Sequence, residues 1–471
     1  MNNLKSHFGA VAPFEHYMWA DSRADYPMIF WLKLTLEGEV EPKRLQSALN
    51  AAAQRHPLLM SCLQGKVHHR RSSLRWVPLT DPRIYLNIVR ENQAFRFPEN
   101  SQLGIDIQRE PGVRLFIRED KEGLSTWHFQ FHHSATDGTG AIQFVEEVFR
   151  LYADPEAQHS DHPVATELYA QRLHCGQTAK SLLRALPANL AAAFRYFCTN
   201  PAALSPELST GLKAKTLVHG PAQERAELST AQWERLKAKA KKDGATINDK
   251  LLTHCFQALH RWHQQRGGPR PIRVAVPVNM RPPLDRSMPA ANCMGMAFID
   301  RKGPILDDRK KLQKSLVEEM GRIKRLHLAY GLNFVISLAG HVRGLVNAIV
   351  LPRYTWKCSA TLVLSNLGDA LRYSTLKRNA EGLIQAGKLT LLRVELLPPL
   401  RAHTQMSMGV VTYGGQLTLT AHYDHTILSQ AEVQAFIKHL TQAVKVSTVA
   451  TEDIRDQALI PEKAADVAPF A

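Results

Sequence analysis

The sequence lacks the segments that carry a chain to or across a membrane. Its first residues have no apolar stretch behind a basic start and no small-residue cleavage site, so no secretory signal is predicted. The longest apolar stretch, residues 332–351, is interrupted by polar and basic residues and does not have the pattern of a membrane span. We therefore expect a soluble, cytoplasmic protein.

Cysteines are few, and none forms a C-x-x-C pair. Such scattered cysteines, several of them inside apolar runs, are typical of reduced core thiols rather than of disulfides or a zinc site. This usage also favours the cytoplasm. The six cysteines are Cys62, Cys175, Cys198, Cys255, Cys293 and Cys358.

The sequence contains fewer acidic than basic residues. The 471 residues include 59 Lys and Arg against 43 Asp and Glu, which gives a formal net charge of +16. A basic surface attracts nucleic acid, anionic lipids, phosphorylated cofactors or acidic proteins, and the charge alone does not choose among them. Zinc-finger spacing, a basic leucine zipper and an RNP-type aromatic motif are all missing, which argues against nucleic acid.

The chain has instead the elements of two lobes. Residues 1–163 are predicted to form an N-terminal lobe, 164–220 a helical connector and 221–471 a C-terminal lobe. The connector contains a basic amphipathic segment, 181–197, for which packing between the lobes is favoured over lying on a membrane surface. Periodicity predicts strands over 28–36, 74–77, 113–117, 126–133, 410–413 and 416–423, and helices over 42–55 and 141–152 and after the capping residues Ser229, Thr246 and Ser429.

Two segments, one in each predicted lobe, share one pattern. TWHFQFHHSATDGTGAIQFVEEVF and LTLTAHYDHTILSQAEVQAFIKHL both predict a strand, a short polar loop and a capped apolar helix. They share little identity, so we interpret them as a structural pseudo-repeat. Only the first copy contains a doubled histidine.

That pair, His132 and His133, ends the predicted strand. Adjacent strand residues point to opposite faces, so the two imidazoles cannot easily bind one metal ion. A neutral imidazole among aromatic walls has a suitable basicity for a general base near neutral pH. Asp137 and Gly138 suit a tight turn, which the aspartate can hold through a salt bridge or backbone amides. The alternative is a pair of core histidines satisfied by carbonyl groups.

His132-His133-x-x-x-Asp137-Gly138 resembles the HHxxxDG motif of an acyltransferase superfamily. Its members include chloramphenicol acetyltransferase, the condensation domains of nonribosomal peptide synthetases, polyketide-associated acyltransferases, wax ester synthases and alcohol acetyltransferases. The resemblance implies a mixed-sheet α/β (α+β) fold of two chloramphenicol-acetyltransferase-like lobes, arranged as a V around a central tunnel. It extends to RHPLL at 55–59, GATINDKLL at 244–252, PVNMRP at 277–282 and LSNLG at 364–368.

The resemblance also implies roles for single residues. The second histidine of the motif is the general base in such proteins, which implies His133, and His132 is expected to pack or hydrogen-bond. The motif aspartate and glycine, Asp137 and Gly138, are implied to be structural. An arginine of the second lobe often pairs with the aspartate, and Arg281 is the best match.

Other polar residues of the resembling segments are less specific. Ser365 and Asn366 are candidates for stabilising an oxyanion or lining the tunnel, although Asn366 is equally explained by its turn. Asn248 and Asp249 are better explained as helix caps.

The function implied is transfer of an acyl group from a coenzyme A or carrier-protein thioester to an alcohol, without a tightly bound cofactor or metal. Acyl-CoA or a phosphopantetheinyl carrier protein would then be a co-substrate, and the positive charge suits either. One alternative is a freestanding condensation enzyme that forms an amide between carrier-bound substrates. Another is a catalytically silent module that binds a carrier protein or a lipid. Peripheral contact with a membrane stays open.

Overall fold

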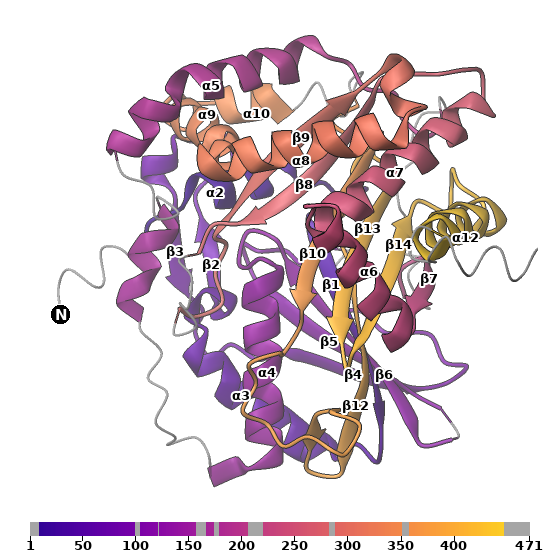
Figure 1. Cartoon of the computed structure of the whole chain (residues 1–471). Helices are drawn as coiled ribbons and strands as arrows, with labels where there is room; N and C mark the ends of the chain where they lie inside the picture. Colours follow the sequence, from indigo (N-terminus) through magenta and orange to yellow (C-terminus); the bar gives the residue numbers. More distant parts are fainter. Residues whose placement is uncertain are drawn as a thin grey trace, which may run out of the picture.

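Two six-stranded sheets of mixed strand direction form the frame of the protein (Figure 1). The computed structural model describes residues 9–98, 104–120, 122–156, 166–173, 179–205, 220–281, 288–350 and 358–446. Among these residues, no helix is both long enough and apolar enough to cross a membrane.

The first sheet has the strand order β11-β12-β1-β6-β5-β4. Helices α3 (Pro42–Arg55) and α4 (Gly138–Ala153) pack against each other and contribute to the core of this lobe. The strands are β1 (Ile29–Glu37), β4 (Tyr85–Arg90), β5 (Val113–Glu119), β6 (Leu124–His132), β11 (Gln385–Ala386) and β12 (Leu389–Leu397).

Strand β6 is buried on both of its faces. Trp127, Phe129 and Phe131 point into the core shared with α3 and α4. His128 and Gln130, which alternate with them, are buried on the other face of the sheet. The strand therefore carries its polar residues into the interior of the molecule.

The second sheet has the order β7-β14-β13-β10-β8-β9. Helices α6 (Thr230–Lys242), α7 (Ile247–Gln264), α8 (Arg309–Arg325) and α12 (Gln430–Val446) share its core. The strands are β7 (Gln223–Leu228), β8 (Ile272–Asn279), β9 (Met294–Arg301), β10 (Leu362–Asp369), β13 (Met406–Tyr413) and β14 (Gln416–Tyr423).

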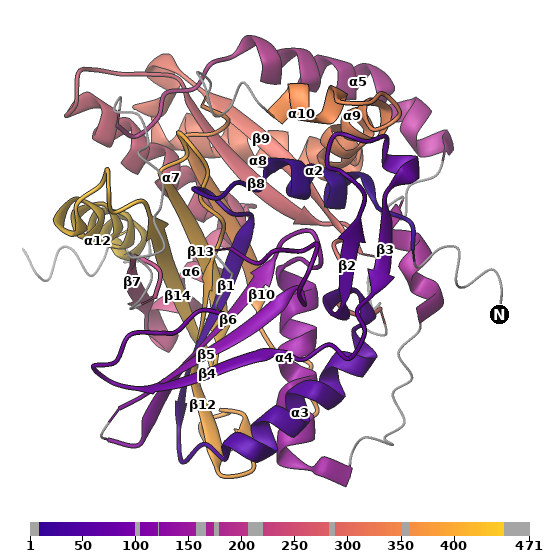
Figure 2. The same cartoon turned by 180° about the vertical axis from the view of Figure 1, so that it is seen from behind.

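Further elements lie beside these two sheets and their helices, and Figure 2 shows them from behind. They are α2 (Pro13–Asp21), α5 (Ala179–Cys198), α9 (Gly331–Ala339), α10 (Leu345–Val350) and the two-stranded sheet of β2 (Ser61–Gln64) and β3 (Arg75–Pro78). Helix α5 belongs to the predicted connector, of which 164–165, 174–178 and 206–219 lie outside the described residues.

Both copies of the predicted pseudo-repeat form a strand, a loop and a helix. Strand β6 leads through a short loop into α4, and β14 leads in the same way into α12. The predicted capping boxes open α6, α7 and α12, where Ser229, Thr246 and Ser429 each accept a hydrogen bond from the backbone amide three residues later.

One part of the predicted C-terminal lobe, residues 221–471, lies in the first sheet instead. Strand β12 pairs antiparallel with β1 along its length, from Trp31 opposite Leu397 to Glu37 opposite Thr390. Its buried apolar side chains belong to the first core, so the chain gains apolar burial there and also covers the edge of β1. The C-terminal part of the chain therefore contributes a strand, β12, to the sheet of the first lobe.

The close contact between β12 and β13 can be tested at Gly409 of β13. A Cβ atom at this position would overlap the carbonyl oxygen of Leu396 in β12, and backbone cannot move aside as a flexible side chain can. We expect Gly409→Ala to lower the free energy of unfolding by about 1–3 kcal/mol, measured by urea unfolding. Gly321→Ala is the matched control, because a Cβ in that helix would meet only the end of the Arg325 side chain. Equal stability of both variants would contradict the close approach.

Candidate active site

His133 follows directly after β6 and lies beside a cavity of about 140 Å³. Its backbone amide donates a 2.7 Å hydrogen bond to the carbonyl of Met28, which fixes the chain where β1 begins and β6 ends. The imidazole lies 5.0 Å from the ring of Phe30, measured between ring centres. The cavity is lined from both lobes, by Phe30, His133 and Leu396 of the first and by Val278, Met296, Val363, Ser365 and Asn366 of the second.

The His133 imidazole is neutral at physiological pH. Burial lowers its pKa to about 4, nearby Asp137 raises it in part, and the positive charge of Arg401 lowers it. A neutral imidazole can accept a proton, so the side chain has the protonation state that a general base needs.

His132 has a different environment. Its Nδ1 atom accepts a 3.1 Å hydrogen bond from the amide of Ser134, and burial together with the neighbouring His133 lowers its pKa to about 3. This bond shapes the turn after β6.

In the described part of the chain, no group of three or more His, Cys, Asp or Glu side chains is placed to hold a metal ion. Cys175 lies outside that part, and the other five cysteines are free thiols.

Asp137 and Arg281 form a buried ion pair between the two lobes. Arg281 Nη1 lies 2.7 Å from Asp137 Oδ2, and its Nη2 donates to the carbonyl of Ala291 at 2.7 Å. The amides of Gly140 and Cys293 donate to the same carboxylate at 2.9 and 2.8 Å, and the former bond caps α4. Burial raises the pKa of Asp137, but Arg281 and these hydrogen bonds outweigh it, so the pKa lies below its ordinary value.

Gly138 and Gly140, in the first turn of α4, lie close to segments of the second lobe. A Cβ atom on Gly138 would meet the side chain of Leu367, which follows Asn366 in the second lobe. At Gly140 a Cβ would overlap the Thr136 hydroxyl and press on the backbone of residues 290–291. Backbone cannot move aside as the end of the Leu367 side chain can, so Gly140 is the more restrictive of the two positions.

Ser365 and Asn366 both line the cavity, and the structure distinguishes between them. The Asn366 side-chain oxygen accepts a 2.8 Å hydrogen bond from the amide of Gly368, whose φ is +69°. Asn366 therefore holds its own turn. The Ser365 hydroxyl has no hydrogen-bond partner among the described residues, and it is the better placed of the two to donate to a ligand.

Asn248 and Asp249 lie at the start of α7, and neither lines the cavity beside His133. Asp249 caps the helix, accepting from the amide of Thr246 at 2.8 Å. The Asn248 side chain is not part of this cap, and its oxygen has no partner among the described residues.

Two residues of the site were missed by sequence reasoning. Asn292 donates from its side-chain amide to the carbonyl of His133 at 2.6 Å, and Arg401 lines the cavity while pairing with Asp21 at 2.5 Å. Both stand in stretches without a recognisable pattern, and only the meeting of distant segments brings them to His133.

Comparison with known proteins gives structural matches only. No protein-family model and no curated sequence matches the chain. The first condensation domain of the calcium-dependent antibiotic synthetase superposes with a TM-score of 0.64 at 12% identity, over 93% of this chain and 96% of that one. The chain has the condensation-domain fold. The predicted arrangement of two chloramphenicol-acetyltransferase-like lobes is thereby confirmed.

Two further structures with this fold cover almost the same length. Polyketide synthase associated protein 5 from Mycobacterium tuberculosis matches with a TM-score of 0.57 and 17% identity, over 94% of this chain and all of its own (100%). A mutant of the starter condensation domain of rhizomide synthetase, in complex with C8-CoA and Leu-SNAC, matches with a TM-score of 0.61 and 13% identity, over 95% and 96% of the two chains. The condensation-domain fold therefore spans nearly the whole chain.

Proposed function

We propose that the protein is an acyltransferase that moves an acyl group from a thioester to an alcohol, with His133 as the general base. The observation that carries the proposal is a neutral imidazole beside a cavity that both lobes line, on a loop held by the Asp137–Arg281 ion pair. A base needs this combination of protonation state, access and fixed position. Fold alone would not support an activity.

The reaction follows from these positions. His133 takes the proton of the acceptor hydroxyl as its oxygen attacks the thioester carbonyl, and the carbonyl oxygen becomes negatively charged in a tetrahedral intermediate. The Ser365 hydroxyl is available to donate a hydrogen bond to this oxygen. When the intermediate collapses, the C–S bond breaks and the imidazolium returns the proton to the departing thiolate. The products are an ester and a free thiol.

The donor proposed is acyl-CoA or the acylated phosphopantetheinyl arm of a carrier protein, and no tightly bound cofactor is needed for the steps above. The net charge of +16 suits a phosphorylated donor or an acidic carrier protein. The starter condensation domain with C8-CoA and Leu-SNAC is a structure of this fold with a CoA thioester. Formation of an amide by the same base is the second candidate, favoured by the several condensation domains among the structural matches.

The test is thiol release from acyl-CoAs of increasing chain length, with alcohols and amines of identical carbon skeleton offered as acceptors. We expect release that requires an alcohol, with the ester identified by mass spectrometry. Release that requires the amine would replace ester formation with amide formation. If acyl-CoAs give no release, the same acceptors are tested with acylated carrier protein, and turnover there would assign that donor. No turnover with either donor would contradict the proposal and favour the silent binding module.

A further inference from the structure

Large hydrophobic side chains are exposed at one end of the molecule. Figures 1 and 2 both show α5, α9 and α10 together there. Among the described residues, every exposed large hydrophobic side chain except Tyr373 lies on these helices or on the turn that joins α9 to α10. We call this set the apolar patch: Leu190, Phe194, Phe197, Leu338, Val342 and Leu345.

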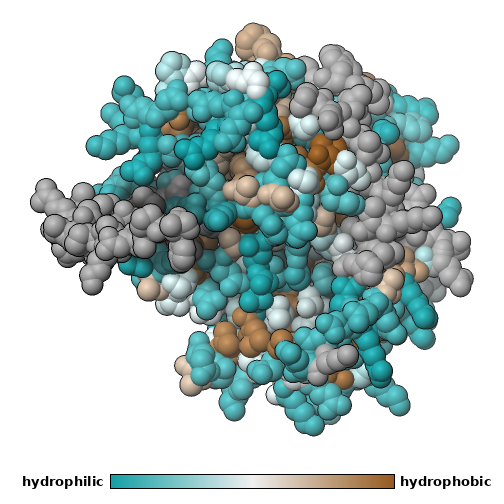
Figure 3. All heavy atoms as spheres, turned by 90° about the vertical axis from the view of Figure 1, so that its right-hand side faces the viewer, coloured by the Kyte–Doolittle hydropathy of each residue, from teal (hydrophilic) through white to brown (hydrophobic). Residues whose placement is uncertain are grey.

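On α5, the residues of the apolar patch form one outward row. Leu190, Phe194 and Phe197 follow the i, i+4, i+7 pattern, and residues with this spacing lie on one side of a helix. The other three residues lie near the end of α9, in the turn after it and at the first residue of α10. Phe194 and Leu338 expose 72% and 67% of their surface. By contrast, the face drawn in Figure 3 is mostly hydrophilic, with hydrophobic residues in small separate groups.

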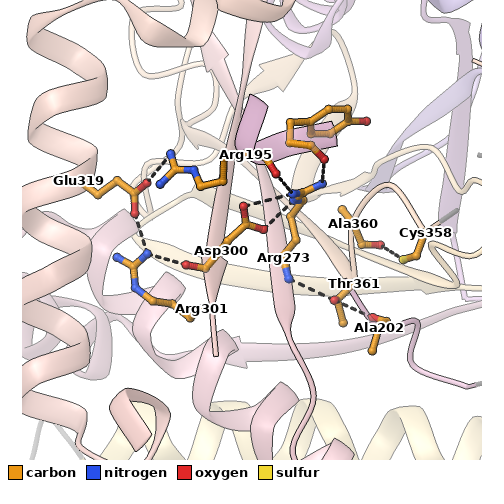
Figure 4. A network of polar contacts seen from close by, with 10 residues as sticks. Arg195, Ala202, Arg273, Asp300, Arg301, Glu319, Cys358, Ala360 and Thr361 are labelled. Carbon is orange, nitrogen blue, oxygen red and sulfur yellow. Dashed lines mark hydrogen bonds and ion pairs between the residues drawn. The ribbon is translucent and has the colours of Figure 1, made fainter. Parts of the chain in front are cut away.

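The orientation of α5 is fixed from its other side, so its outward row is a stable feature. Arg273 of β8 donates to the carbonyls of Arg195 and Tyr196 at 3.5 and 3.2 Å, which holds the last turn of α5 against the second sheet (Figure 4). Its guanidinium also binds both carboxylate oxygens of Asp300, at 2.7 and 3.2 Å. Arg195 itself pairs with Glu319 of α8 at 3.2 Å. The inner side of α5 thus packs on elements of the second lobe, while its outer side carries the exposed row.

The segments that carry the apolar patch have charges of one sign. Residues 168–206, which include α5, contain no Asp or Glu, and neither do residues 320–368, which include α9 and α10. Lys324 and Arg325 at the end of α8 and Arg343 in the turn before α10 are exposed. Glu319, just before the second segment, is already paired with Arg195 and Arg301. The two segments that carry the apolar patch are therefore basic.

We propose that the apolar patch docks the protein on the surface of an anionic lipid bilayer. Apolar rows of this kind enter the boundary between headgroups and acyl chains, and the flanking Lys and Arg side chains bind lipid phosphates. A second copy of the chain fits less well, because a two-fold contact would set these basic segments against themselves. A fluid lipid surface also requires no matching shape. This docking concerns a different surface from the cavity beside His133.

The first test is flotation of the purified protein with vesicles, in the absence of any substrate. Vesicles of phosphatidylcholine alone are compared with vesicles in which about one third of the lipid is phosphatidylglycerol. We expect binding to the anionic vesicles that weakens as salt is raised, and much weaker binding to the neutral ones. Failure of the wild-type chain to bind anionic vesicles would overturn the proposal, whatever its acyl transfer activity.

Variants locate the contact. Phe194→Glu with Leu338→Glu is expected to reduce binding to anionic vesicles at least tenfold, on the order expected for removing two inserted side chains and adding two negative charges. Tyr373→Glu is the matched control, because Tyr373 is 63% exposed and lies outside the patch, and its binding is expected to stay at the wild-type level. Equal loss in both variants would show a general charge effect and contradict the assignment.

The oligomeric state separates lipid from a protein partner. Light scattering of the wild-type chain is expected to give a monomer, and so is that of the doubly substituted variant. A wild-type dimer that the two substitutions dissociate, without binding to anionic vesicles, would assign the patch to contact between copies and overturn the lipid proposal.

Discussion

Replacing His133 with alanine is expected to lower kcat/KM for acyl transfer by about 10²- to 10⁴-fold, the usual range for the loss of a general base. The imidazole is the neutral group beside the cavity that can take the acceptor proton, and the alanine has no group to replace it. The measurement is the rate of thiol release with the donor and acceptor that the wild-type enzyme uses.

The matched control for this variant is His254→Ala. His254 is also buried, and its pKa is also lowered to about 4, by burial and by nearby Arg309 and Lys250, but it lies on α7 away from the cavity. We expect its activity to stay within a fewfold of the wild-type value. Undiminished activity of His133→Ala would exclude His133 as the base, and equal loss in both variants would indicate damage to folding.

The pH profile gives an independent reading of the same prediction. His133 accepts a proton only in its neutral form, and its pKa is about 4 in the folded protein. The value of kcat/KM should therefore stay level on the alkaline side and fall only as the pH drops through about 4, well below the ordinary histidine value of about 6.5. A fall centred near the ordinary value would contradict the effect of burial.

Arg281→Ala is expected to lower the free energy of unfolding by about 3–5 kcal/mol, because it leaves the Asp137 carboxylate buried without its charged partner. The measurement is urea unfolding at neutral pH. Arg23→Ala is the control, since Arg23 pairs with Asp25 at the surface with 46% of each side chain exposed, and its unfolding free energy should hardly change.

A double variant separates lost charge balance from lost packing. Asp137→Asn keeps an N-cap residue at α4, and combined with Arg281→Met it removes both charges while filling part of the space. We expect the double variant to be more stable than Arg281→Ala alone. If it is less stable, the hydrogen bonds of the pair matter more than its charge.

The pH dependence of stability has a definite sign. The pKa of Asp137 is lower in the folded state than the unfolded value of about 3.9, because Arg281 and the backbone amides outweigh burial. The stabilisation is therefore present above the unfolded value and is lost as the pH falls through the folded one. Arg281→Ala should weaken this acid dependence.

The local features of the site were predictable from the sequence. The alternation of Trp127, Phe129 and Phe131 predicts a strand with one apolar face, and Asp137 before an apolar periodic run predicts a helix cap. Both depend on neighbours only a few residues apart, so the chain itself carries the information. Asn366 could not be assigned from the sequence, because an asparagine at this position suits both an oxyanion donor and a turn residue. The hydrogen bond from the Gly368 amide to its side chain shows the turn role.

By itself, the sequence determined the two-lobed pattern, the strand-loop-helix unit with its doubled histidine, and the excess of positive charge, because each is a property of neighbouring residues or of composition. The tertiary structure decided which distant residues meet: β12 against β1, Arg281 against Asp137, and Asn292 and Arg401 around His133. It also decided that α5 is open on its outer side. The physical reason is that pKa values, buried charge and exposure depend on groups that are near in space, which no local pattern specifies.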